Sequence, residues 1–480
     1  MKRFSPRHTH FAPDPLSYVK RALRALAAPL AAGALLLITG AVWQAPLCVA
    51  LLVGAEYLTA KAEELRARKL ALGLQGLPDT ATVYRAGKVL HIPPGEVLAT
   101  DAVVVREDEV LPCDGVVAKG ESKIYAYPPA PGGIGVSVSP GSPVRAASRN
   151  GFGLLAIKPA GPASESLYEK WRRAAIIAAE RPSHSERRIL SAAAILPIGA
   201  AAAAAAGFAA SLLMGAGAAV SARRAAAVLF VGGSFGLTGA MAHLRRVFML
   251  GAAREGFVGA GGEVMDSLGT ATTAIIGAAG AQTMREAAEV KPNPALREGA
   301  EGLGKALSEM RIEPVYITGA KAEQASRVSA LLGVTDVHAA VLPRDMERVF
   351  SELLDESGGK AIYLGSAVND KVLPEKANPG VLLDGYEKGP GAQLSAAVIL
   401  GHSPAPLLGA LRAAKRARLC MALCSVFTAV TKAAVAGLSF GGVTGAVFAC
   451  AAECALCAGL WVAAERAVVP TRKARAEGGA

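Results

Sequence analysis

Sulfur side chains are concentrated near the carboxyl end of this 480-residue chain, where five of the seven cysteines follow residue 419. Cys450, Cys454 and Cys457 have the spacing i, i+4, i+7, which places their thiols on one face of a helix. Thiolates bind soft ions such as zinc or copper(I), so this face is a candidate metal site. The alternative is that these cysteines are small apolar side chains that fill a close-packed helix pair.

Two charged residues lie within the same apolar segments. A carboxylate such as Glu453 is unfavourable in hydrocarbon and usually has a partner there. Lys432, in the preceding segment, could pair with it or extend its ammonium to the membrane boundary. If the two helices are antiparallel, Cys424 lies at a depth similar to that of Cys457. The candidate metal set therefore comprises Cys424, Cys450, Cys454, Cys457 and Glu453.

Membrane helices are needed to position these side chains, and the composition is suited to them. The chain is 52% hydrophobic with a mean hydropathy of +0.36. Its apolar segments, most of them close to the length that crosses a bilayer, form three pairs within residues 25–62, 188–250 and 418–466. The turn of the first pair is predicted at residues 43–46, and the third pair is hinged at Gly441-Gly442. We therefore predict a multi-pass α-helical membrane protein with about six helices.

The net charge of +12 is concentrated at the borders of these segments, for example at Lys20, Arg21 and Arg24. Positively charged flanks of membrane helices stay on the cytoplasmic side, so both extramembrane domains are predicted to be cytoplasmic. The membrane itself is predicted to be a cell (plasma or inner) membrane. Arg223 and Arg224 lie on the predicted outer loop and run against this rule. The lipid bilayer accounts for the basic borders, and no basic platform with interleaved aromatics indicates nucleic-acid binding.

Two extramembrane regions separate the helix pairs. Residues 75–165 are rich in Val, Ile, Gly and Pro, which predicts short strands and turns and hence a small β-domain. In residues 261–401, short apolar runs alternate with helical stretches, which predicts a parallel sheet with crossover helices. Polar tails occupy residues 1–24 and 467–480.

This order of elements, together with several stretches of sequence, resembles the heavy-metal (copper, zinc and cadmium) branch of the P-type cation-transporting ATPases. The resemblance covers about residues 50 to 465 and is carried by "VALLVGAEYLTAKAEEL", "VLPCDGVVAKGES", "GAAREGFVGAGGEVMDSLG" and "VYITGAKAEQASRVSALLGVTDVHAAVLPRD". It implies that the β-domain is actuator-like and that the α/β domain is a HAD-like phosphorylation domain. Such pumps use ATP and Mg²⁺ to move a heavy-metal ion.

The residues that drive such a pump are replaced at the matching positions. The phosphorylated aspartate of DKTGT aligns with Gly277, and glycine has no side chain on which an acyl-phosphate could form. The Mg²⁺-binding aspartate aligns with Ser366, the aspartate of TGD with Ala320, the lysine of LPxDK with Met346, and the glutamate of TGE with Gly132. The membrane CPC motif aligns with Gly233-Ser234-Phe235. Retained positions are Thr318, Asn369 and Asp370.

The segment between the phosphorylation loop and the following strand is also short. The family inserts a nucleotide-binding domain of about a hundred residues there, whereas residues 283–315 leave room for little more than one helix. The leading hypothesis is a pseudoenzyme that binds or regulates a partner, such as an active membrane transporter or a second copy of itself. The alternatives are a metal-binding or passively conducting membrane protein, and a working heavy-metal pump with displaced catalytic residues.

Overall fold

The computed structural model describes residues 29–74, 76–125, 135–233, 235–282, 295–366, 376–383 and 397–468. The tail at 1–24 and the positions Gly132, Ser234, Asn369 and Asp370 lie outside these ranges. The chain divides into two compact units. One contains the segments up to Leu70, His184–Val247 and from Arg416 onward, and the other contains Ala71–Ser183 and Phe248–Lys415.

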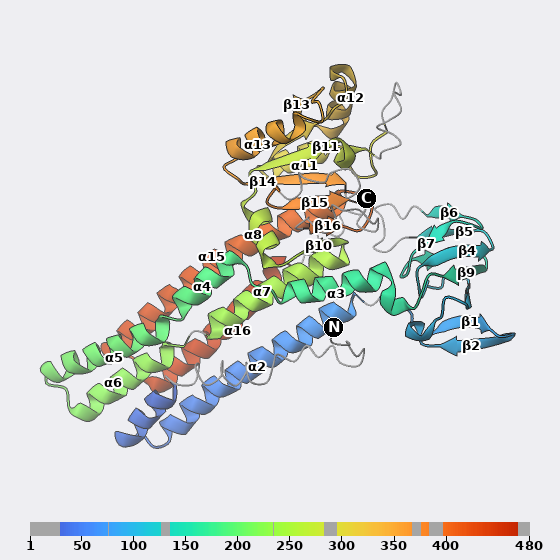
Figure 1. Cartoon of the computed structure of the whole chain (residues 1–480). Coiled ribbons are helices and arrows are strands. Elements are labelled where there is room, and N and C mark those ends of the chain that lie inside the picture. The colour runs from blue at the N-terminus through green and yellow to red at the C-terminus, as the bar shows by residue number, and fades with distance from the viewer. Residues whose placement is uncertain are drawn as a thin grey trace. The chain divides into compact units, whose positions relative to one another are not determined.

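The first unit consists of apolar helices. Among the described residues, five helical spans are long and apolar enough to cross a membrane, and Pro29–Ile38 forms a shorter apolar helix. This confirms a multi-pass helical membrane protein. In Figure 1, α5 and α6 lie side by side as a hairpin. The helices are α2 (Gln44–Leu72), α4 (His184–Ala193), α5 (Leu196–Leu213), α6 (Ala218–Val231), α7 (Phe235–Arg254), α15 (Ala405–Phe440) and α16 (Ala446–Val468).

Glycines with positive φ lie in two of the turns between these helices. A turn predicted at residues 43–46 lies instead at 39–43, where Gly40 has a φ of +79°. Pro46 is consequently in the first turn of α2, where a missing backbone N–H breaks no hydrogen bond. The predicted hinge between α15 and α16 is confirmed, with Gly442 at a φ of +73°.

The β-domain contains two antiparallel sheets. The larger has six strands in the order β2-β1-β3-β9-β4-β7, and the smaller has three in the order β6-β5-β8. In β3 and β9 alternate side chains are buried, as the period of a strand requires, and they form a core with Val83 and Leu111. The strands are β1 (Ala81–Arg85), β2 (Lys88–Ile92), β3 (Ala102–Val105), β4 (Gly115–Lys119), β5 (Ser122–Tyr125), β6 (Val136–Val138), β7 (Pro143–Val144), β8 (Arg149–Asn150) and β9 (Leu155–Pro159).

The α/β domain is built on a seven-stranded sheet in the order β10-β16-β15-β14-β11-β12-β13. Strand β11 lies inside this sheet between β14 and β12, and all its residues are buried. Strands β11 to β16 pair in parallel, whereas β10 pairs antiparallel with β16 at the edge, so the predicted parallel sheet is in fact mixed. This strand order is compatible with the expected HAD-like domain.

From β10 to β14 helices alternate with the strands along the chain, which is the usual way of connecting parallel strands. The bounds of the domain's elements are β10 (Phe257–Gly259), α8 (Gly262–Thr270), β11 (Thr273–Gly277), α9 (Ala278–Ala281), α11 (Leu303–Glu309), β12 (Glu313–Ile317), α12 (Ala322–Leu332), β13 (Asp336–His338), α13 (Met346–Glu356), β14 (Ala361–Ser366), β15 (Gly380–Leu383) and β16 (Ala397–Ile399).

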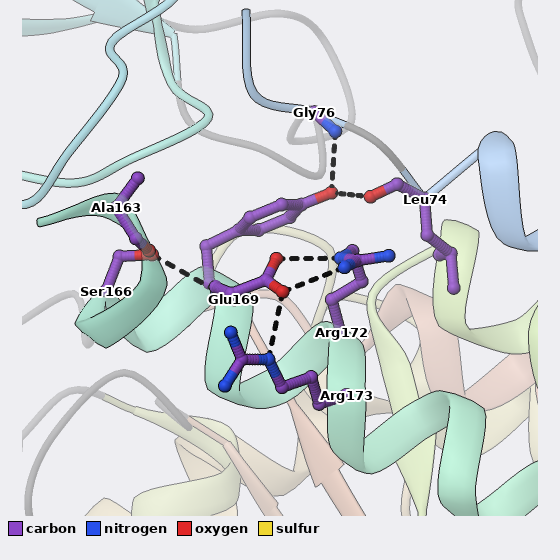
Figure 2. Close-up of polar contacts among 8 residues, drawn as sticks. Leu74, Gly76, Ala163, Ser166, Glu169, Arg172 and Arg173 are labelled. Carbon is purple, nitrogen blue, oxygen red and sulfur yellow. Dashed lines mark hydrogen bonds and ion pairs between the residues drawn. The ribbon is translucent and has the colours of Figure 1, made fainter. Parts of the chain in front are cut away.

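The chain enters and leaves the β-domain through a shared contact at Tyr168. Helix α3 (Leu167–Ala179) follows the domain and starts at Ser166, whose side chain accepts a hydrogen bond from the Glu169 backbone. Figure 2 shows this cap and the ion pairs of Glu169 with Arg172 and Arg173. The Tyr168 hydroxyl is buried, accepts from the Gly76 backbone N–H at 2.9 Å and donates to the Leu74 carbonyl.

Removing this hydroxyl is expected to loosen the β-domain at both of its connections. The variant Tyr168→Phe keeps the ring but removes the hydroxyl's contacts with the Gly76 N–H and the Leu74 carbonyl, which still hydrogen-bond each other at 3.1 Å, so we expect a loss of about 0.5–1.5 kcal/mol. The measurement is the thermal unfolding midpoint of the purified chain. The matched control is Tyr84→Phe, because the Tyr84 side chain is half exposed and its loss should leave the midpoint unchanged.

Candidate functional site

Three of the aligned catalytic positions come together at one edge of the α/β sheet. Gly277 ends β11 and is paired with Ile317 of β12, and the preceding Ile276 is paired with Leu364 of β14. Gly277, Thr318 and Ser366 therefore lie at the carboxyl ends of three adjacent parallel strands. That edge is where ligands bind in sheets of this class.

The space that a nucleophile would need at Gly277 is already filled. The φ of Gly277 is −73°, which any residue can adopt, so the backbone does not demand glycine. A Cβ placed there would lie 2.5 Å from the Tyr363 hydroxyl oxygen, closer than real Cβ contacts. Tyr363 is buried and packs edge-on against Phe350, with ring centroids 5.3 Å apart. An aspartate at this position would have to displace that ring.

The other aligned positions that lie within the described ranges also lack charged groups. The Thr318 hydroxyl is buried and accepts a hydrogen bond from the Ala320 backbone at 3.1 Å. Ser366 is buried and offers a neutral hydroxyl, and Met346 packs against the apolar cluster that contains Phe350. Magnesium is held mainly by carboxylate oxygens in phosphoryl-transfer sites, and none of these side chains supplies one.

Two contacts at this edge were missed by sequence reasoning. The buried Arg297 guanidinium donates through Nε to the carbonyls of Ala279 at 2.8 Å and Gln282 at 3.2 Å. Gly280 lies so close to β14 that a Cβ would be 2.4 Å from the Leu364 carbonyl oxygen. These contacts fix α9 against the sheet. No spacing pattern in the sequence points to Arg297 or to Tyr363, because both act through residues distant along the chain.

The membrane unit contains a buried ion pair at the predicted position. Lys432 Nζ lies 2.7 Å and 2.6 Å from the two carboxylate oxygens of Glu453, and both side chains are buried. Nζ also donates to the Val231 carbonyl at 2.7 Å. Val231 ends α6, where carbonyls lack helical partners and a cation is favoured. All three ammonium hydrogens are thus accommodated, and the predicted pairing of Lys432 with Glu453 is confirmed.

The cysteines around this pair face different neighbours. Cys450 faces the thiol of Cys48, and the Cys454 thiol donates to the Leu51 carbonyl at 3.6 Å. Cys457 packs against Gly236, where a Cβ would lie 2.4 Å from its sulfur. Cys424 lies 3.7 Å, sulfur to sulfur, from Cys420.

The predicted five-residue metal set therefore does not form a single cage. In the described part of the chain, no three His, Cys, Asp or Glu side chains converge as a metal site. Metal binding by Cys450, Cys454, Cys457, Cys424 and Glu453 stays a prediction. Outside the membrane, Cys113 is buried in the β-domain, and desolvation raises the pKa of its thiol to about 12, so it stays protonated at neutral pH.

Comparison with known proteins supports the architecture. The family model of the P-type ATPase actuator domain matches residues 75–126. A cadmium/zinc-transporting ATPase of Oryza sativa subsp. japonica is 29% identical over 150 residues, which are 31% of this chain and 14% of that protein. A probable copper-exporting P-type ATPase of Archaeoglobus fulgidus is 37% identical over 108 residues, which are 22% of this chain and 13% of that protein.

A solved zinc-transporting PIB-type ATPase in its E2·Pi state aligns with a TM-score of 0.43 at 15% identity, covering 95% of this chain and 96% of that one. The matching segments span 14% and 13% of the two curated relatives. The chain thus combines candidate membrane helices, a β-domain that matches the P-type ATPase actuator model over residues 75–126, and a mixed α/β sheet. Over these segments the chain is similar to heavy-metal P-type ATPases.

Proposed function

We propose that this chain is a pseudo-ATPase, a pump scaffold that forms no phosphorylated intermediate. The observation that carries the proposal is at the end of the central strand β11. Gly277 occupies the position of the phosphorylated aspartate, and the Tyr363 hydroxyl fills the space its side chain would need. Without a nucleophile at this position, the two-step transfer of phosphate has no first step.

Two further features support the loss of catalysis. The aligned Mg²⁺ and phosphate contacts are Ser366, Ala320 and Met346, none of which carries a charge. Residues 278–312 separate β11 from β12, a span too short for a nucleotide-binding domain of about a hundred residues. Phosphoryl transfer depends on positioning and charge stabilisation by such groups together, so their joint replacement removes the reaction as a whole.

The parts that remain suit binding. The helices, the β-domain and the α/β sheet form a scaffold, and its partner in this proposal is an active membrane transporter or a second copy of the chain. The named activities of the relatives, cadmium/zinc transport and copper export, make a heavy-metal ion the candidate ligand. In this proposal the protein resides in the plasma or inner membrane, with both extramembrane domains in the cytoplasm.

The alternative, a working pump with displaced catalytic residues, makes the opposite prediction about ATP. We expect the full chain, reconstituted in lipid vesicles, to hydrolyse Mg-ATP no faster than protein-free vesicles, with zinc, cadmium or copper(I) present. An active heavy-metal pump reconstituted in the same way is the positive control. Metal-stimulated hydrolysis by this chain would favour the alternative.

A further inference from the structure

A second pair of thiols lies apart from the cysteine face of α16. Cys420 and Cys424 are one helical turn apart on α15, and their sulfur atoms are 3.7 Å apart. Both side chains are buried, with 8% and 4% of their surface exposed. The two thiols point toward each other, so an ion could bind between them with little movement of the helix.

The position of this pair along α15 separates it from the Lys432–Glu453 ion pair. Lys432 follows Cys424 by eight positions, which at the helical rise is about 12 Å along the axis. Arg416 precedes Cys420 by one turn and Arg418 by two residues, so the dithiol is close to the basic border of the apolar segment. Cys420, Cys424, Thr428 and Lys432 form one buried row at i+4 spacing.

We propose that Cys420 and Cys424 form a two-coordinate thiolate site for copper(I). Thiolates are soft ligands that favour this ion, whereas structural zinc takes four ligands. In the described ranges, no further His, Cys, Asp or Glu side chain joins these two sulfurs to make a set of three. A two-sulfur site therefore matches a soft monovalent ion better than zinc.

The negative charge of the copper(I)-dithiolate site would be offset by arginine side chains near the border of the apolar segment. Binding displaces one proton from each thiol, and the two thiolates with copper(I) carry a single negative charge. Arg416 and Arg418 supply positive charge within the adjoining turn of the same helix. The proposed copper(I) site does not require that phosphorylation has been lost. Copper(I) binding and phosphate labelling are measured separately, so either proposal can fail without the other.

The test is a competition between the full chain and a chromogenic copper(I) chelator, in detergent, without oxygen and with all thiols reduced. We expect one copper(I) to be retained per chain. The ion should remain in a Cys450→Ser/Cys454→Ser/Cys457→Ser variant and be lost from Cys420→Ser/Cys424→Ser and from each single variant of that pair. The proposal would be overturned if copper(I) were lost from the variant of the three α16 cysteines and kept in the Cys420/Cys424 variant. It would also be overturned if the native chain retained no copper(I).

Copper X-ray absorption on the loaded native chain provides a readout that needs no variant to fold. The proposal requires two sulfur neighbours and no third ligand. Three or more ligands would contradict it, as would zinc retained through the same cysteine pair with equal affinity. Substitution of the pair by alanine, with the melting midpoint measured before copper is added, separates loss of the site from loss of the fold.

Discussion

Replacing Gly277 with aspartate is expected to destabilise the α/β domain without restoring phosphorylation. The new Cβ would lie 2.5 Å from the Tyr363 hydroxyl, and the carboxylate would enter a buried position. Overpacking of a core costs about 1–3 kcal/mol, and burying a carboxylate adds a desolvation penalty to that. We therefore expect a total loss of about 3 kcal/mol or more, seen as a lower unfolding midpoint of the purified chain.

Two further variants test whether the loss of stability comes from the clash with Tyr363. At Gly401, an added Cβ would meet only the Ser403 nitrogen at 3.9 Å, so Gly401→Asp should have a much smaller effect. Adding Tyr363→Ala to Gly277→Asp should relieve the clash, which would appear as a favourable coupling of about 0.5–3 kcal/mol between the two sites. An unchanged midpoint in Gly277→Asp would show that Tyr363 does not occupy this space. Phosphate incorporated by the single variant would show that the remaining groups suffice for catalysis.

Breaking the Lys432–Glu453 ion pair is the second change with a large expected effect. Either Lys432→Met or Glu453→Leu leaves an uncompensated polar partner inside the membrane unit, and such losses typically reach about 3–5 kcal/mol. The double variant removes both charges and replaces them with apolar side chains of similar size. We expect it to recover most of the stability, since buried ion pairs contribute little net free energy relative to well-packed apolar groups.

The control for this cycle is an exposed pair in the same unit. Lys61 and Glu64 on α2 are 2.9 Å apart but largely solvated, so their removal should leave the melting midpoint unchanged. Melting is followed in the same detergent for all variants. If the single variants had the same melting midpoint as the native chain, the Lys432 ammonium would be hydrated. Its alternative placement at the membrane boundary would then be correct.

Much of the fold could be predicted because its signals are local. Helix α12 spans Ala322–Leu332, and its apolar spacing and the following Gly333 are signals that lie within the helix and its cap. The buried strands β11 and β14 read as continuous apolar runs, which is typical of the centre of a parallel sheet. The pairing of Lys432 with Glu453 could be predicted as well, because a buried charge in hydrocarbon requires a partner.

The features of the fold and the site that could not be predicted depend on contacts between segments distant in sequence. Tyr363 looks like any strand residue until β14 is placed beside β11, where its hydroxyl faces Gly277. Cys424 was expected near Cys457 from depth alone, but the sulfur contact of Cys424 is with Cys420, one turn earlier on the same helix. The antiparallel strand β10 at the sheet edge also escaped prediction, because a strand of three residues has too short a pattern to recognise.

Inorganic phosphate is the simplest test of whether this chain forms a phosphorylated intermediate. Labelling by phosphate with Mg²⁺ requires the nucleophile and the metal ligands but no nucleotide-binding domain, so it isolates the chemistry at the end of β11. We predict that the acid-quenched native chain retains no label, under conditions in which an active heavy-metal pump is labelled. Stoichiometric label that maps to an aspartate of this chain would contradict the account.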